Sequence, residues 1–220
     1  MFAKAYIGFS LILLLCVGLA FWASEHYYQH MLLTPDMEAA ATDAHMVKGE
    51  YAKVKPQRYF GIGGGFAVFD ADGNLLYQDE KTFPYMLDAA EIRCIPDYDD
   101  YSFINSYDLD VPQYDGDYLL VKTIYGPDDE DSETELMVLD QGYRVISGAF
   151  EADKKKYTER EYRILTGDFP ENAELIRTTL RDGRILVAAT KKWDIDDYTT
   201  IGRKSNMVYW SLLPISLLLI

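Results

Sequence analysis

The sequence is poor in cysteine and in basic residues. Its 220 residues include two cysteines, Cys16 and Cys94, and 21 Lys+Arg against 36 Asp+Glu. Because Cys16 lies in an apolar N-terminal run, no disulfide is expected in the rest of the chain, and we expect Cys94 to be a small buried hydrophobic residue. The net charge of -15 argues against nucleic acid as a partner, since a polyanion would be repelled. With 49% hydrophobic residues the chain can bury a core, so it is not a disordered acidic tail.

Charge is also nearly absent from both ends of the chain. Residues 1–24 contain one charged side chain, Lys4, and residues 207–220 contain none. As a helix, the uncharged run 5–23 would be about 28 Å long, close to the roughly 30 Å hydrocarbon core of a bilayer. It predicts a transmembrane helix, with residues 1–4 on the cytoplasmic side because of Lys4. A cleaved signal peptide, cut after Gly18-Leu-Ala20, is the alternative.

The C-terminal run 207–220 is shorter, about 21 Å as a helix. We interpret it as the start of a second transmembrane helix that continues beyond residue 220; a tail lying shallowly in the membrane is the alternative. If both runs span, residues 24–206 form a domain outside the cytoplasm.

The middle of the chain predicts a mixed fold with antiparallel strands. Three pairs of short apolar runs flank the turns Ala71-Asp-Gly73, Asp140-Gln-Gly142 and Arg181-Asp-Gly183, and each glycine is expected to supply the positive φ of a hairpin turn. Residues 118–125 predict a further strand. With the helices described next, this pattern indicates an α+β fold built on an antiparallel sheet.

Helices are expected in three places. Residues 24–53 predict a long N-terminal helix, interrupted near Thr34-Pro35, that packs beside the sheet. A second helix is expected around 85–92. A third begins at the capping box Thr158-Glu-Arg-Glu161 and ends before Gly167. The glycine-rich run 61–65 precedes a strand and so lacks the context of a phosphate-binding loop; we interpret it as an entry into the sheet.

One stretch, 97–135, holds 13 acidic residues and a single base, Lys122. The candidate site within it is a run of carboxylates whose oxygen ligands suit a divalent cation and whose charge suits a cationic peptide. This acidic patch comprises Asp128, Asp129, Glu130, Asp131 and Glu133. The alternative is a solvated acidic loop. His26 and His30 would share a helix face, but two ligands do not make a zinc site, and no catalytic residues or cofactor are expected.

These features together resemble the extracytoplasmic sensor region, PAS-like or Cache, of bacterial membrane histidine kinases of two-component systems. The resemblance rests on the first apolar run, the hairpin Phe66–Tyr77, the segment Leu139–Ile146, the helix Tyr157–Gly167 and the final hairpin followed by a second apolar run. It implies a homodimer in the bacterial plasma membrane that senses a small ligand, a divalent cation or a cationic peptide. It also implies that phosphorylation and the response regulator involve a cytoplasmic part that these residues do not contain.

Two other functions fit the same pattern. The chain could belong to a receptor with another output, such as a chemoreceptor or a nucleotide cyclase, or to a membrane-anchored envelope or assembly protein. None of the three histidines, His26, His30 and His45, is followed by the acidic residue and proline of a phosphorylated histidine, so this chain alone is not expected to act as a kinase.

Overall fold

The computed structural model describes residues 14–15, 17–25, 35–98, 102–125, 132–151, 153–192, 199–200, 202–204 and 207. The chain divides into two compact units: a folded domain, 35–192, and a terminal unit formed by 1–34 and 193–220. The expected α+β class with antiparallel strands is confirmed, but the domain contains two four-stranded sheets where we expected one.

Sheet A has the strand order β2-β1-β8-β7 and joins the first and last hairpins of the domain. Its strands are β1 (Gly65–Phe69), β2 (Leu75–Gln78), β7 (Ala173–Thr179) and β8 (Ile185–Lys191). The central pairing is long-range: β1 lies antiparallel to β8, with Ala67 opposite Val187. Every residue of β1 is buried, which requires cover on both faces of the sheet.

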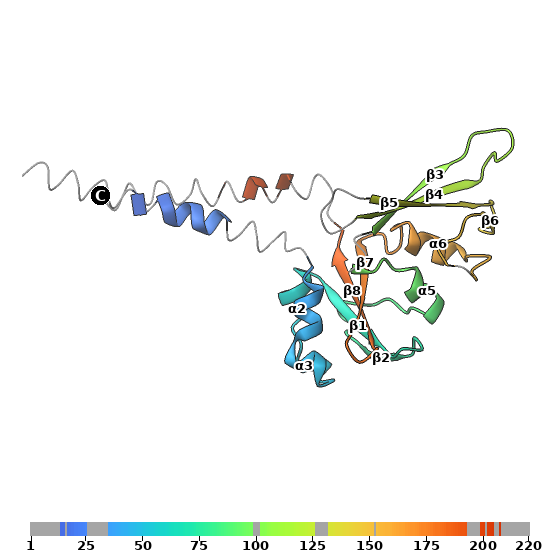
Figure 1. Ribbon diagram of the computed structural model, residues 1–220. Helices are drawn as coiled ribbons and strands as arrows, with labels where there is room; N and C mark the ends of the chain where they lie inside the picture. Colours follow the sequence, from blue (N-terminus) through green and yellow to red (C-terminus); the bar gives the residue numbers. More distant parts are fainter. Residues whose placement is uncertain are drawn as a thin grey trace, which may run out of the picture. The chain divides into compact units, whose positions relative to one another are not determined.

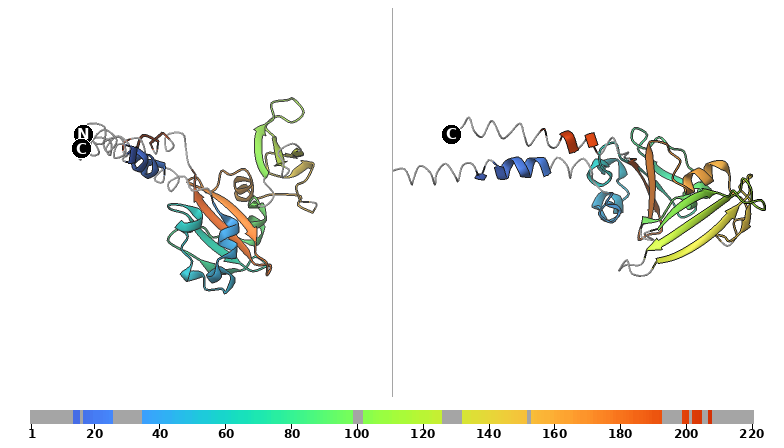
Figure 2. Two further views of the ribbon diagram at one scale, coloured as in Figure 1. Left: turned by 60° about the vertical axis from the view of Figure 1, so that its left-hand side comes forward. Right: turned by 90° about the horizontal axis from the view of Figure 1, so that it is seen from above.

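Sheet B is a meander of four consecutive strands in the order β3-β4-β5-β6. The strands are β3 (Ser102–Asp108), β4 (Tyr118–Tyr125), β5 (Ser132–Leu139) and β6 (Val145–Ser147). Figure 2 shows this sheet as a ribbon whose long strands extend beyond the helices. One face, carrying Leu120, Met137 and Leu139, is buried in the domain core.

Helices lie on both sides of sheet A (Figure 1). Four short helices precede it: α2 (Met37–Thr42), α3 (Ala44–Val47), the 3-10 helix η1 (Tyr51–Lys53) and α4 (Gln57–Phe60). They bury Met37, Met46 and Phe60 against Phe66 and Leu186 of the sheet. On the opposite side lie α5 (Ala89–Cys94) and α6 (Glu159–Leu165).

The face of sheet A that looks toward sheet B supplies the larger core. Ala67, Phe69 and Val187 of sheet A share one buried cluster with Leu120 and Met137 of sheet B. The two sheets are therefore layers of a single domain, and a side chain placed between them is in contact with both.

Three details of the predicted elements are corrected. The long helix expected over 37–53 is broken, because the Asp43 carboxylate accepts hydrogen bonds from the amides of His45 and Met46 and so caps a new helix in mid-run. The helix expected around 85–92 begins later, at Ala89, after the capping box of Asp88 and Glu91. In the middle hairpin the positive φ belongs to Tyr143, at 62°, and not to Gly142.

Other expectations are confirmed. The Thr158 capping box starts α6, with Glu161 bonding back to the Thr158 amide, and Gly167 follows the helix with a φ of 75°. Gly73 and Gly183 have the expected positive φ in their hairpin turns. The first hairpin joins β1 to β2, and the last joins β7 to β8.

In the terminal unit, residues 14–15 and 17–25 are helical. Large apolar side chains such as Leu14, Phe21 and Trp22 are more than half exposed there, whereas Ala20 is buried. Within the described residues, the structure contains no helix that is both apolar and long enough to cross a bilayer. The predicted membrane segments, 5–23 and 207–220, fall partly or almost wholly outside those residues and stay predictions.

Candidate functional site

A cavity of about 130 Å³ lies where sheet A, sheet B and the two later helices meet. The α5–β3 connection, strands β3, β4 and β7, and the segment from Phe150 to α6 all contribute to its wall. Five of the lining residues are charged: Arg93, Asp97, Lys122, Glu151 and Arg177. Three cationic and two anionic side chains therefore meet here, in a protein whose net charge is -15.

Arg177 of β7 joins the two sheets at this cavity. Its Nε donates a hydrogen bond to the Ile95 carbonyl at 2.8 Å, and its backbone amide donates to the Pro96 carbonyl at 3.1 Å. Its Nη2 lies 3.5 Å from Oδ2 of Asp97. The segment 95–97 leads directly into sheet B, so Arg177 holds the start of sheet B on the edge of sheet A.

Among the described residues, the acidic partners of the cavity's cationic side chains are distant. Besides the 3.5 Å pair of Arg177, Lys122 Nζ lies 3.6 Å from Glu135 Oε2, and Arg93 Nε lies 3.9 Å from Glu151 Oε2. Charge-assisted N–H···O hydrogen bonds are about 2.7–2.9 Å long. These pairs are thus ionic contacts without good hydrogen bonds, and a ligand oxygen placed among the cations could approach more closely than their present partners do.

Two ion pairs beside the cavity, on helices α5 and α6, are tighter. Lys154 Nζ lies 2.5 Å from Glu161 Oε1, and Arg160 Nε lies 3.0 Å from Glu91 Oε1. Both glutamates also complete the capping boxes of their helices, so they fix α5 and α6 in place. The short pairs therefore fix α5 and α6, while the three pairs in the cavity are longer.

Cys94 and Tyr157 form the apolar part of the wall. Burial raises the pKa of the Cys94 thiol to about 12, and burial also raises the pKa of Tyr157. The thiol is therefore protonated at neutral pH and is a poor nucleophile. The expectation that Cys94 is a buried hydrophobic residue is confirmed, with 2% of its surface exposed. The cavity suits binding better than covalent chemistry.

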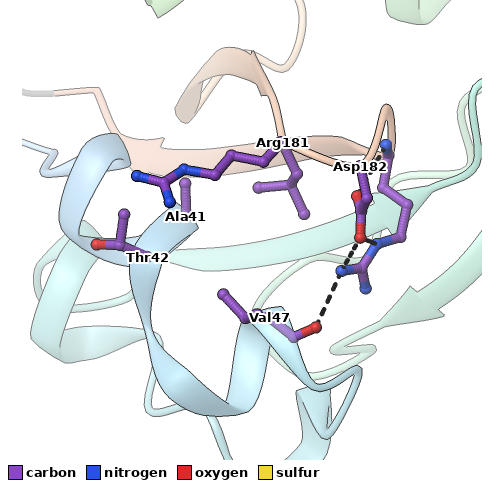
Figure 3. A pocket seen from close by; sticks show the side chains of 7 residues that line it. Ala41, Thr42, Val47, Arg181 and Asp182 are labelled. Atoms are coloured by element: carbon purple, nitrogen blue, oxygen red, sulfur yellow. Dashed lines mark hydrogen bonds and ion pairs between the residues drawn. The ribbon is translucent and has the colours of Figure 1, made fainter.

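A second pocket, of about 250 Å³, lies between the β7–β8 turn and helices α2 and α3 (Figure 3). Arg181 extends toward Ala41 and Thr42 in that view. Arg184 is already occupied there: it pairs with Asp182 at 2.5 Å, bonds to the Tyr51 hydroxyl and donates to the Val47 carbonyl at 3.3 Å. These contacts hold the β7–β8 turn against the helices. We therefore interpret this pocket as part of a structural contact and not as a ligand-binding site.

The structure does not gather the acidic stretch 97–135 into one surface. Asp97 lines the cavity between the sheets. Asp110 and Asp115 lie in the loop before β4, whereas Glu135 lies opposite Lys122 in the middle of that strand and Glu133 opposite Ile124, about 20 Å along from its first residue. Among the described residues the acids are thus divided over three places.

The predicted acidic patch is largely untested by the structure. Asp128, Asp129, Glu130 and Asp131 lie outside the described residues, and Glu133 is exposed on β5. In the ranges that the structure describes, no three His, Cys, Asp or Glu side chains are placed to hold a metal ion. His26 and His30 also lie outside these ranges; His45 Nδ1 lies 2.8 Å from Glu50.

Sequence reasoning missed Arg177 altogether and noticed Lys122 only as the single base among acids. The sequence does contain an indication of each residue: a single charged side chain interrupts an otherwise uncharged strand segment, in Leu175-Ile-Arg177 and in Val121-Lys122-Thr123. Their convergence depends on the pairing of β3 with β4 and on the long-range contact of residues 95–97 with β7.

Comparison with protein-family models, with curated proteins and with solved structures gave no match for this chain.

Proposed function

We propose that the chain is the signal-receiving region of a sensor histidine kinase, displayed outside a bacterial plasma membrane, and that the cavity between its sheets binds a small anion. The observation that carries this proposal is the convergence of Arg93, Lys122 and Arg177 on one cavity with acidic partners at 3.5–3.9 Å. A carboxylate or phosphate among them would form the shorter charge-assisted hydrogen bonds that these pairs lack. A volume of about 130 Å³ restricts the ligand to a small molecule.

The ligand would act on the connection between the sheets. An anion bound by Arg177 competes with Asp97 for the guanidinium, and so alters the contact through which β7 holds segment 95–97. A ligand shifts a protein between two arrangements only by binding one of them more tightly, and a contact that it replaces is a direct source of such a difference.

Sheet A connects the cavity with both ends of the chain. Arg177 lies in β7, which pairs along its length with β8, and β8 ends two residues before the C-terminal segment. Helix α2, which begins shortly after the N-terminal segment, contacts β7 from the other side of the sheet. A shift of β7 would therefore act on the two places where the chain enters and leaves the folded domain, Pro35 and Lys192.

Two further features support the proposal. The described helical residues 17–25 present Leu19, Phe21 and Trp22 outward, and such side chains are stable in contact with lipid.

Sheet A, with helices on both faces and its first and last hairpins side by side, fits the PAS-like (Cache) interpretation, in which sheet B is an addition between the two hairpins.

The test is a chimeric receptor. Residues 1–220 would be joined to the cytoplasmic half of a well-characterised sensor histidine kinase whose response regulator drives a reporter gene. Acetate, succinate, citrate and inorganic phosphate would be supplied separately outside the cells. The proposal predicts that at least one of them changes reporter output, and that Arg177→Met and Lys122→Gln each abolish this response.

Matched controls separate the cavity from general loss of charge. Arg181→Met and Lys155→Gln remove exposed cations elsewhere in the domain and should leave the response intact. A chimera that responds equally well with and without the Arg177 guanidinium would contradict the anion site. A chimera that reaches the membrane but responds to none of the four anions would contradict the proposed ligand class.

A further inference from the structure

The two faces of sheet B differ in an unusual way. Leu120 and Met137 face each other across β4 and β5 on the buried side, so the alternate positions face outward. By the register of β3, β4 and β5, the described outward positions are Asn105, Tyr107, Leu119, Val121, Thr123, Ser132, Thr134, Leu136 and Val138. We call this set the outer face of sheet B.

The outer face carries no charge at any of these positions, although 26% of the chain is charged. All four charged residues of the sheet, Asp108, Lys122, Glu133 and Glu135, occupy the opposite face by register. A one-sided antiparallel sheet normally has its polar residues on the solvent side. Here the charged residues share the face of Leu120 and Met137, on which Asp108, Glu133 and Glu135 are themselves exposed, while the other face is uncharged and partly apolar. An uncharged, partly apolar exposed face is the pattern of a surface that is covered by a partner.

The apolar centre of the outer face is open in the single chain. Tyr107 is 53% exposed and Leu136 is 56% exposed. Leu136 lies opposite Val121 on the neighbouring strand, and the next outward pair is Thr123 with Thr134. Neighbouring apolar and uncharged side chains thus form a continuous strip across β4 and β5.

We infer that the outer face of sheet B is the surface on which two copies of this chain associate. Each copy carries a net charge of -15, so two copies repel one another wherever their acidic surfaces meet. An uncharged face is the surface on which they can approach at least electrostatic cost. A basic partner, by contrast, would gain by binding the acidic surface and would have no reason to prefer this face.

The geometry of the sheet suits such an assembly. A two-fold axis brings the same face of both copies together, and two twisted sheets pack face to face about 10 Å apart. One strand of seven residues and two of eight give a projected area of about 400 Å² per copy. This is below the roughly 800 Å² per partner of a standard interface, so the dimer is weak in solution and is favoured when both copies share one membrane.

Cross-linking tests the inference by position. Leu136→Cys and Leu76→Cys would be made in the full chain with Cys16→Ala; Leu76, on β2 of sheet A, is a matched control at 49% exposure. A bifunctional maleimide with a spacer of about 10 Å, the distance between packed sheets, would be added to membranes. We expect the Leu136→Cys chain to form cross-linked dimers at least about ten-fold faster than the control. Equal rates would overturn the inference.

A charge at the centre of the face gives a second measurement. Leu136→Asp should weaken association of the full chain at least about ten-fold in detergent, by sedimentation equilibrium, because two like charges meet across the axis. Leu76→Asp should leave it unchanged, and both variants should melt near the parent temperature because both positions are exposed. A monomeric parent chain, a Leu136→Asp chain that associates as the parent does, or capture of a different protein by Leu136→Cys would each overturn self-association.

Discussion

Arg177 offers a test of how the two sheets are held together. Arg177→Met removes the guanidinium but keeps an apolar stem of similar length. The substitution deletes the 2.8 Å hydrogen bond to the Ile95 carbonyl and the 3.5 Å contact with Asp97, while the backbone bond to Pro96 is unaffected. The side-chain contacts of Arg177 with residues 95–97 would then be lost, while the backbone contact of this segment with β7 remains.

The expected loss follows from these two contacts. A hydrogen bond from a charged donor contributes about 1.5–3 kcal/mol, and the lower value applies here because 23% of the Arg177 side chain is exposed. The ion pair with Asp97 is long and partly solvated, which limits it to about 0.5 kcal/mol. The free energy of unfolding should fall by about 2 kcal/mol, equivalent to roughly 4–8 °C in melting temperature for a domain of 150–250 residues.

The assay is thermal unfolding of the full chain in detergent, followed by near-ultraviolet circular dichroism. All three tryptophans, Trp22, Trp193 and Trp210, lie outside residues 35–192, whereas 13 of the 18 tyrosines lie inside, so changes in the tyrosine signal report mainly the folded domain. Arg181→Met, in the exposed β7–β8 turn, should shift the melting temperature by less than about 2 °C. If Arg177→Met does no more than this control, Arg177 does not join the sheets as described.

Three further predictions concern single side chains. Thr158→Ala removes the cap of α6 and should lower the free energy of unfolding by about 1 kcal/mol in denaturant titration; no change in the midpoint would argue against the cap. Cys94, with a pKa raised to about 12, should resist iodoacetamide at pH 8 in the folded chain, where roughly one thiol in ten thousand is ionised, and react on unfolding, as followed by mass spectrometry; rapid labelling of the folded chain would contradict its burial. The Tyr59 hydroxyl donates to Asp43 Oδ2 at 2.5 Å and holds the pKa of Asp43 below its usual range. The bond therefore stabilises the fold above the ordinary pKa of about 3.9, and the gain is lost as the pH falls through the lowered value. Tyr59→Phe should thus reduce the melting temperature more at pH 7 than at pH 2, and an equal reduction would refute this linkage.

Local features of the fold were predictable from the sequence because each depends on neighbouring residues. The turns at Gly73 and Gly183 and the capping box of Thr158 are complete within a few positions. The middle hairpin also formed as expected, but its left-handed residue is Tyr143 and not the glycine before it. There, Asp140 Oδ1 accepts hydrogen bonds from the amides of Gly142 and Arg144. These bonds extend the turn by one residue beyond the predicted Asp140–Gly142, so that it includes Tyr143.

The division into two sheets was not predictable in this way. Hairpin signals identify which strands are consecutive partners but not which hairpins lie side by side, and the pairing of β1 with β8 spans more than one hundred residues. The unbroken apolar run Phe66-Ala-Val-Phe69 was the available sign that both faces of sheet A are covered. The cavity depends on that same long-range arrangement, which is why its cations went unrecognised.

We propose that the folded acidic domain is displayed outside the plasma membrane, and labelling of whole cells distinguishes this location from the cytoplasm. Leu76→Cys, about half exposed on β2, would be introduced into the full chain with Cys16→Ala, and intact spheroplasts would be treated with a membrane-impermeant maleimide. Buried Cys94 serves as the internal unreactive thiol. We expect the introduced cysteine to be labelled before lysis to the same extent as after it; labelling only after lysis would contradict the proposed location of the domain.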